Sequence, residues 1–157
     1  MAYNKEMADV ENLDTLFLAE CKNLHKRISC DFIGVALQKF HHPDVNWPYV
    51  CGNTNEKYKH VTVRYGKGIA GKVIATGSDM LISHFPENIL GKSTDYPIML
   101  AERLVSAYAV PIRVNGVPKG SLLIGYRKEH PIDGDQFYKV KEAVENMEEF
   151  LPSYFKN

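Results

Sequence analysis

The chain has 157 residues, of which 45% are hydrophobic, 11% aromatic and 24% charged. A chain of this length and composition is expected to bury roughly 70% of the surface that it exposes when unfolded, which excludes a disordered protein and indicates one compact domain. Its 19 Lys and Arg residues balance 19 Asp and Glu residues. This zero net charge argues against nucleic acid and against an anionic membrane surface as partners.

Neither a targeting segment nor a membrane span is predicted. Residues 1–7 lack the charged and apolar regions of a secretory signal, and no window approaches the ~18 consecutive apolar residues that a membrane helix needs. The cysteines Cys21, Cys30 and Cys51 are odd in number and have no C-x-x-C spacing, so neither a metal site nor a disulfide framework is indicated. We expect a cytoplasmic protein whose reduced thiols fill space, with no metal and no cofactor.

The N-terminal part of the chain predicts a helix followed by three strands. Apolar residues recur at three- and four-residue spacing over residues 7–28, which is typical of a helix with one buried face. Residues 31–40 are rich in Phe, Ile, Val and Leu and indicate the first strand. Shorter strands are predicted at 47–51 and at 58–65, where apolar and polar residues alternate.

A glycine-rich segment follows these strands. Gly66, Gly68 and Gly71 indicate a turn that leads into a short helix, and Gly77 is typical of the residue that ends such a helix. The first three glycines have two interpretations: close approach of the backbone to a ligand, or a turn with close helix packing. A brief strand is predicted at residues 80–83.

A second short helix is predicted to begin at residue 97. Thr94 or Asp95 can cap it and Pro97 suits its first turn, so we expect it to run to about Val105. The preceding residues 85–94 contain Pro, Gly and polar side chains. They indicate a loop over the helix start that can act as a lid.

The last part of the chain predicts a hairpin and a long helix. Strands at 107–114 and 121–126 flank an Asn-Gly pair, which is a strong signal for a tight hairpin turn. Asp135, or Asp133 just before it, opens a helix whose apolar residues lie on one face. The element order indicates an α+β fold: a single domain over residues 1–157, with an antiparallel sheet, the terminal helices on one face and short helices and loops on the other.

Two blocks of this sequence resemble the GAF domain family. The first is GKGIAG at residues 66–71, followed by the short helix and by TG at 76–77. The second is AVPI at 109–112, with the return strand GSLLIG at 120–125. The resemblance spans essentially the whole chain. It implies a domain that binds a small molecule in a pocket enclosed by the sheet, the short helices and the loops.

Within the family, the chain resembles stand-alone nitrate receptors. The free-standing length, Trp47 in the sequence NWP, and the sequence DYPI at 95–98 carry this resemblance. It implies a cytoplasmic receptor that binds nitrate and modulates an oxygen-sensing histidine kinase of a two-component system controlling nitrate and nitrite respiration, with no catalytic residues of its own. Terminal helices of this family often pair between subunits, so both a monomer and a homodimer stay open.

The same resemblance implies the residues that contact nitrate. They are Trp47, Ile69, Ala70, Tyr96, Pro97 and Ile98. Ile69, Ala70 and Ile98 would act through the backbone, whereas Pro97 has no N–H and would contribute only shape. Helix N-termini carry unsatisfied N–H groups and a partial positive charge worth ~0.3–1 kcal/mol each, so two of them can bind an anion without Lys or Arg.

Two side chains of this set could add hydrogen bonds to nitrate. Trp47 has an indole N–H and Tyr96 a phenol O–H, although a core position for Trp47 and a plain helix start at Tyr96 are the simpler interpretations. A ligand of about four heavy atoms gains at most about −6 kcal/mol, which corresponds to a dissociation constant of roughly a few tens of micromolar.

Two other functions compete with the nitrate receptor. The free methionine-(R)-sulfoxide reductases are also stand-alone GAF domains, but they carry a cysteine in the glycine-rich turn where this chain has Ala70. Thiol catalysis is therefore poorly supported. The second alternative is a GAF interaction module with another small ligand or with none.

Overall fold

Six strands form one antiparallel sheet, in the order β3-β2-β1-β6-β5-β4, in the computed structural model, which describes residues 10–154. The strands are β1 (Phe32–Gln38), β2 (Asp44–Cys51), β3 (Thr62–Arg64), β4 (Met80–Ile82), β5 (Ser106–Val114) and β6 (Val117–Tyr126). The helices are α1 (Val10–Arg27), α2 (Gly68–Thr76), α3 (Pro97–Ala101) and α4 (Gly134–Tyr154), with the 3-10 turns η2 (Lys57–His60) and η3 (Ser93–Asp95).

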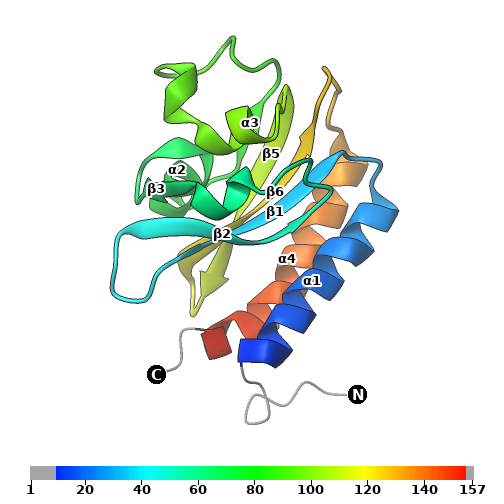
Figure 1. Cartoon of the computed structure of the whole chain (residues 1–157). Helices are drawn as coiled ribbons and strands as arrows, with labels where there is room; N and C mark the ends of the chain where they lie inside the picture. Colours follow the sequence, from blue (N-terminus) through cyan, green and yellow to red (C-terminus); the bar gives the residue numbers. More distant parts are fainter. Residues whose placement is uncertain (1–9, 155–157) are drawn as a thin grey trace.

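The two terminal helices, α1 and α4, lie side by side on one face of the sheet (Figure 1). Side chains alternate between the two faces of each strand, so Ile33, Val35 and Leu37 of β1 all face these helices and form part of the core beneath them. Phe17 of α1 stacks on Tyr49 of β2, with the ring centroids 4.6 Å apart. This side of the fold is a closed apolar core.

The other face of the sheet is covered by shorter elements. α2, α3 and the loops around them pack there on Phe32 and Ala36, the alternate residues of β1. The α+β architecture with terminal helices on one face and short helices on the other is thus confirmed. None of the helices in residues 10–154 is both long and apolar enough to cross a bilayer.

A β-bulge in β2 decides where the only tryptophan points. Val35 pairs with Tyr49 and Leu37 with Asn46, so two residues of β2, Trp47 and Pro48, lie opposite one residue of β1. In a regular strand, positions 47 and 49 would share a face. Because of the bulge, Trp47 packs with the α2 and α3 side while Tyr49 packs with α1 and α4.

Several predicted boundaries are confirmed. The hairpin turn lies at Asn115 and Gly116, which have φ of 51° and 80°, and Gly77 caps α2 with φ of 68°. Asp133 caps α4, because its Oδ1 accepts the Gln136 N–H at 3.2 Å and the Gln136 side chain accepts the Asp133 N–H at 3.1 Å. The predicted start of the first helix, at residue 7, lies outside the described residues.

Two local predictions are wrong. Residues 58–65 are not one strand: η2 takes the first part, and β3 spans only Thr62–Arg64. α3 ends at Ala101 instead of reaching Val105, and its N-cap is Tyr96, not Thr94 or Asp95. The Asp95 carboxylate instead accepts the Lys92 N–H at 2.9 Å. It therefore caps the start of η3, the 3-10 turn that precedes α3.

Candidate functional site

Five of the six predicted contact residues lie in one buried cluster between the sheet and the short helices. Their relative exposures are 0–3%, and Pro97 is half-buried beside them. The five are Trp47, Ile69, Ala70, Tyr96 and Ile98. The fold therefore brings together residues from β2, α2 and α3 that are up to 51 positions apart in the sequence, from Trp47 to Ile98.

The starts of α2 and α3 meet at one pocket of about 370 Å³. Gly68, the first residue of α2, and Pro97, the first residue of α3, both line it. Neither helix has a side-chain hydrogen bond at its N-cap, which is Lys67 for α2 and Tyr96 for α3. Their first-turn N–H groups therefore meet no side-chain cap, and their partial positive charges point toward the same region.

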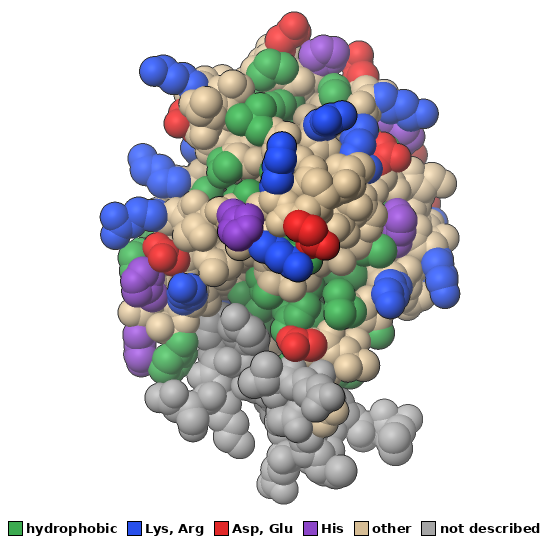
Figure 2. Space-filling model, in the orientation of Figure 1, with side chains coloured by type: hydrophobic (Ala, Val, Ile, Leu, Met, Phe, Trp, Pro, Cys, Tyr) green, Lys and Arg blue, Asp and Glu red, His purple; other side chains and the backbone are tan. Residues whose placement is uncertain are grey.

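Basic side chains line the same pocket, although the net charge of the whole chain is zero. Its lining includes Arg64, Lys67 and Lys72, with Asp95 as the acidic member. Lys and Arg side chains project from the edge of the molecule where β3 and α2 lie (Figure 2). The sequence does not predict this cluster, because an anion site at helix N-termini needs no side-chain charge, although Lys67 and Lys72 directly flank the GIAG segment.

Tyr96 ties the start of α3 to the loop before it. Its hydroxyl donates to the Leu90 carbonyl at 2.8 Å, and its ring lies edge-on to Phe85 with the centroids 6.0 Å apart. The Nζ of Lys72 lies 5.1 Å from the centroid of the same ring. In this arrangement the phenol proton, which the sequence suggested as a donor to the anion, goes to the loop over the site.

Trp47 contributes its ring to the same buried cluster. Its ring packs so closely on β1 that a Cβ added at Gly34 would come within 2.9 Å of it. Trp47 also lines a second pocket, of about 290 Å³, together with Asn46, Pro48 and Tyr58. Of the six predicted contact residues, only Pro97 lines the pocket at the helix starts, whereas Trp47 lines this second pocket.

The structure separates the roles of the glycines. Gly66 and Gly68 adopt φ of 85° and 64°, a conformation that side chains disfavour. A Cβ at Gly71 would lie 2.4 Å from the Arg64 carbonyl oxygen, so this glycine lets α2 pack against β3. The turn-and-packing interpretation therefore holds for this segment, while Gly68 also lines the pocket.

All three cysteines pack on the opposite face of the sheet, with α1 and α4. Burial raises the pKa of both Cys21 and Cys30 to about 12, so these thiols stay protonated and fill space, as the sequence predicts. Cys51 is half-buried. Within residues 10–154, no cluster of three or more His, Cys, Asp or Glu side chains could hold a metal ion.

Solved structures of other proteins resemble this chain closely. A mutated NreA protein from Staphylococcus aureus, altered in its nitrate-binding site, is 31% identical, with a TM-score of 0.74, over 80% of this chain and 93% of that chain. A type II free methionine-R-sulfoxide reductase from Thermoplasma acidophilum is 17% identical, with a TM-score of 0.74, over 94% of this chain and 96% of that one. A GAF domain/HD domain protein from Geobacter sulfurreducens is 13% identical, with a TM-score of 0.73, over 90% and 92%.

These likenesses carry different weight. The two structures below 20% identity share the fold alone, whereas the NreA protein also shares nearly a third of the aligned sequence. No protein-family model matches the chain, and no curated protein matches it.

Proposed function

The chain belongs to the GAF domain family, close to NreA, and on this premise we propose that it is a nitrate receptor. The observation that carries the proposal is the meeting of two helix N-termini without side-chain caps at one pocket lined by cations. Nitrate is planar, singly charged and weakly hydrated, so partial charges and backbone N–H groups suffice to offset its desolvation.

In the proposed complex, nitrate lies against the first turns of α2 and α3. The backbone N–H groups of Ile69, Ala70 and Ile98 donate to its oxygens, and Pro97 shapes the site. Trp47 supplies an indole N–H and an apolar wall. We propose that Tyr96 contributes its ring and holds the lid, residues 85–94, because its hydroxyl is bonded to Leu90.

Thermal unfolding with matched anions tests this binding. At about 10 mM nitrate and a dissociation constant of a few tens of micromolar, linkage predicts about 3 kcal/mol of stabilisation, or roughly 6–12 °C in Tm for a domain of this size. Equal concentrations of chloride and sulfate are the controls. In Trp47→Phe, which keeps an aromatic wall but has no N–H, we expect the nitrate-specific shift to shrink. An equal shift with all three anions would contradict the proposal.

We propose that the receptor acts on a sensor histidine kinase. Nitrate can change the kinase only if it changes the affinity of the receptor for it, typically by ~1–3 kcal/mol. The loop that Tyr96 ties down is the segment best placed to differ between free and bound states. Kinase autophosphorylation, measured with this protein across saturating nitrate, tests the switch separately from binding; an unchanged rate would refute the switch alone.

The enzyme alternative lacks support at the pocket. Reduction of methionine sulfoxide needs a thiolate at the substrate, but Ala70 stands in the glycine-rich turn and Cys21, Cys30 and Cys51 all pack on the other face of the sheet. We therefore propose a receptor without catalytic residues. Incubation with free methionine-(R)-sulfoxide and dithiothreitol, followed by quantification of methionine, should give no turnover above that of the reductant alone.

A further inference from the structure

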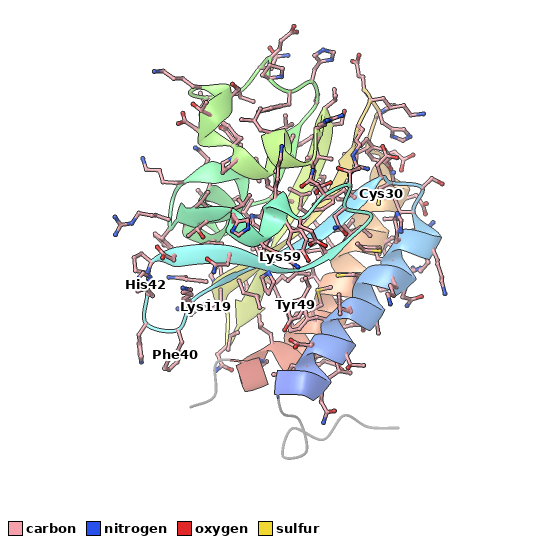
Figure 3. The ribbon with its side chains drawn as sticks, in the orientation of Figure 1. Cys30, Phe40, His42, Tyr49, Lys59 and Lys119 are labelled. Atoms are coloured by element: carbon pink, nitrogen blue, oxygen red, sulfur yellow. The ribbon has the colours of Figure 1, made fainter. Side chains whose placement is uncertain are left out.

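A cysteine and a histidine are in contact where β2 and α1 end, on the face of the sheet away from the pocket. The Cys51 Sγ lies 3.6 Å from the His25 Nδ1. On the other side of the ring, the His25 Nε2 lies 2.9 Å from the Cys30 carbonyl oxygen. Figure 3 shows Cys30 beside the end of α1.

This geometry assigns the proton positions. A carbonyl oxygen can only accept, so the His25 Nε2 must carry a hydrogen and donate it to Cys30. The Nδ1 of the neutral ring is then an acceptor, and the Cys51 thiol donates to it. The Cys51 thiol, the His25 ring and the Cys30 carbonyl thus form a chain of nucleophile, base and orienting group. This is the arrangement that activates cysteine nucleophiles.

The backbone holds both partners in place. Cys51 is followed by Gly52, whose φ is 79° and where a Cβ would lie 2.2 Å from the Asp31 carbonyl oxygen. The Arg127 Nη2 donates to the Gly52 carbonyl at 3.0 Å, which fixes this strand end. His25 lies in the last turn of α1.

The other groups near the pair do not compete for the role. Cys21 and Cys30 are the neighbouring thiols, and both are buried. The acidic neighbours of those two thiols are Glu20 on α1 and Asp31, which directly precedes β1. Of the three thiols, only Cys51 combines a base within hydrogen-bonding distance with partial exposure.

We propose that Cys51 is an oxidation site for small hydroperoxides, with His25 as its general base. His25 takes the thiol proton, and the Cys51 sulfur attacks the distal oxygen of the peroxide. An S–O bond forms and the O–O bond breaks. Cysteine is oxidised by two electrons to the sulfenic acid, and the hydroperoxide is reduced to water or an alcohol after His25 returns the proton to the leaving oxygen.

The test is the rate and the position of oxidation in the full chain. Wild type, His25→Asn and Cys51→Ser are exposed to hydrogen peroxide near neutral pH with a sulfenic-acid trap, and the adduct is located by peptide mass spectrometry. We expect the adduct on Cys51, at least about 10-fold faster in wild type than in His25→Asn, and absent in Cys51→Ser. The rate at which iodoacetamide alkylates Cys51 should also be lower in His25→Asn than in wild type, because alkylation needs the same thiolate.

Three outcomes would overturn the proposal: an adduct mainly on Cys21 or Cys30, equal rates in wild type and His25→Asn, or a Cys51 rate no greater than that of free cysteine. Circular dichroism of each variant excludes unfolding as the cause of a changed rate. If His25→Asn does not fold, the adduct position and the comparison with free cysteine in wild type still decide the result. Because the pair lies on the opposite face from the pocket, this outcome is independent of nitrate binding.

Discussion

Tyr96 is the residue at which the helix start, the loop and the cation meet. It is fully buried, its hydroxyl donates to the Leu90 carbonyl, and Lys72 lies over its ring. A hydrogen bond of this kind contributes about 1 kcal/mol to stability. We therefore propose that Tyr96 holds the loop at residues 85–94 and that its hydroxyl does not bond nitrate directly.

The variant Tyr96→Phe separates these two roles. Its free energy of unfolding should be about 1 kcal/mol lower than that of wild type, because only the hydrogen bond to Leu90 is lost. Its nitrate affinity should change by less than about threefold. Urea denaturation and nitrate titration measure the two quantities. Tyr138→Phe, at a position 66% exposed on α4, is the matched control. A loss of nitrate affinity of about 10-fold or more in Tyr96→Phe would show that the hydroxyl bonds the anion directly.

The buried thiols predict a loss of stability at alkaline pH. Burial raises the pKa of Cys21 and Cys30 from 9.0 to about 12 in the folded state. Below about pH 9 both states hold these protons, but above it the unfolded state releases them first, so the free energy of unfolding falls as pH rises toward 12. The slope for each thiol approaches roughly 1.4 kcal/mol per pH unit.

Urea denaturation between about pH 8 and pH 11 measures this slope. Burial also raises the pKa of Tyr126, to about 12, so a tyrosine contributes to the upper part of the same range. Cys21→Ala removes one titrating thiol and should flatten the curve from about pH 9 upward. A curve identical to that of wild type would mean that Cys21 titrates normally in the folded protein.

At the scale of elements, the site depends on how closely α2 packs against β3. Gly71 makes this contact, because a Cβ there would collide with the Arg64 carbonyl oxygen at 2.4 Å. In Gly71→Ala, backbone must move, so we expect a loss of roughly 1–3 kcal/mol in stability and a weaker nitrate site as α2 shifts. Gly134→Ala is the control, since nothing lies within 4 Å of its Cβ. Chemical denaturation and nitrate titration of both variants decide this; equal effects would contradict the packing role.

The end of α3 is fixed by a buried ion pair. Glu102 is 0% exposed, and its Oε1 accepts from the Arg127 Nη2 at 2.6 Å and from the Thr54 N–H at 3.0 Å. The Arg127 Nε also donates to the Glu102 carbonyl at 2.9 Å. This clamp joins the end of α3 to the end of β6 and to the loop after β2.

Breaking the clamp should cost far more than a surface ion pair. Arg127→Met leaves a buried carboxylate unpaired, for which we expect roughly 3–5 kcal/mol of destabilisation by urea denaturation. Adding Glu102→Gln removes the stranded charge, so the double variant should recover part of the loss. Additive effects of the two substitutions would contradict a direct pairing of Glu102 with Arg127.

Over the whole molecule, a net charge of zero is compatible with a local cluster of basic side chains. The chain has no net charge, yet Arg64, Lys67 and Lys72 gather at the pocket where two helices begin. A count of charges excludes a broadly basic surface but says nothing of where individual cations lie. An anion site of this kind attracts its ligand without giving the molecule a general affinity for polyanions.

The sequence predicts most of this architecture but little of its fine geometry. Periodicity at α1 and α4 and the Asn-Gly turn are local signals, and the structure confirms them. The bulge at Trp47 and Pro48 and the clamp at Glu102 depend on contacts between distant segments, which no local pattern encodes. The six nitrate contacts came from resemblance, and they stay a prediction.

Isothermal titration calorimetry measures directly whether this chain binds nitrate. We expect saturable heat with one site per chain and a dissociation constant of roughly a few tens of micromolar, and no comparable heat with sulfate. Nitrite and chloride titrations then define the selectivity of the site. No heat with nitrate at millimolar concentration, from protein shown to be folded, would mean that the chain is not a nitrate receptor.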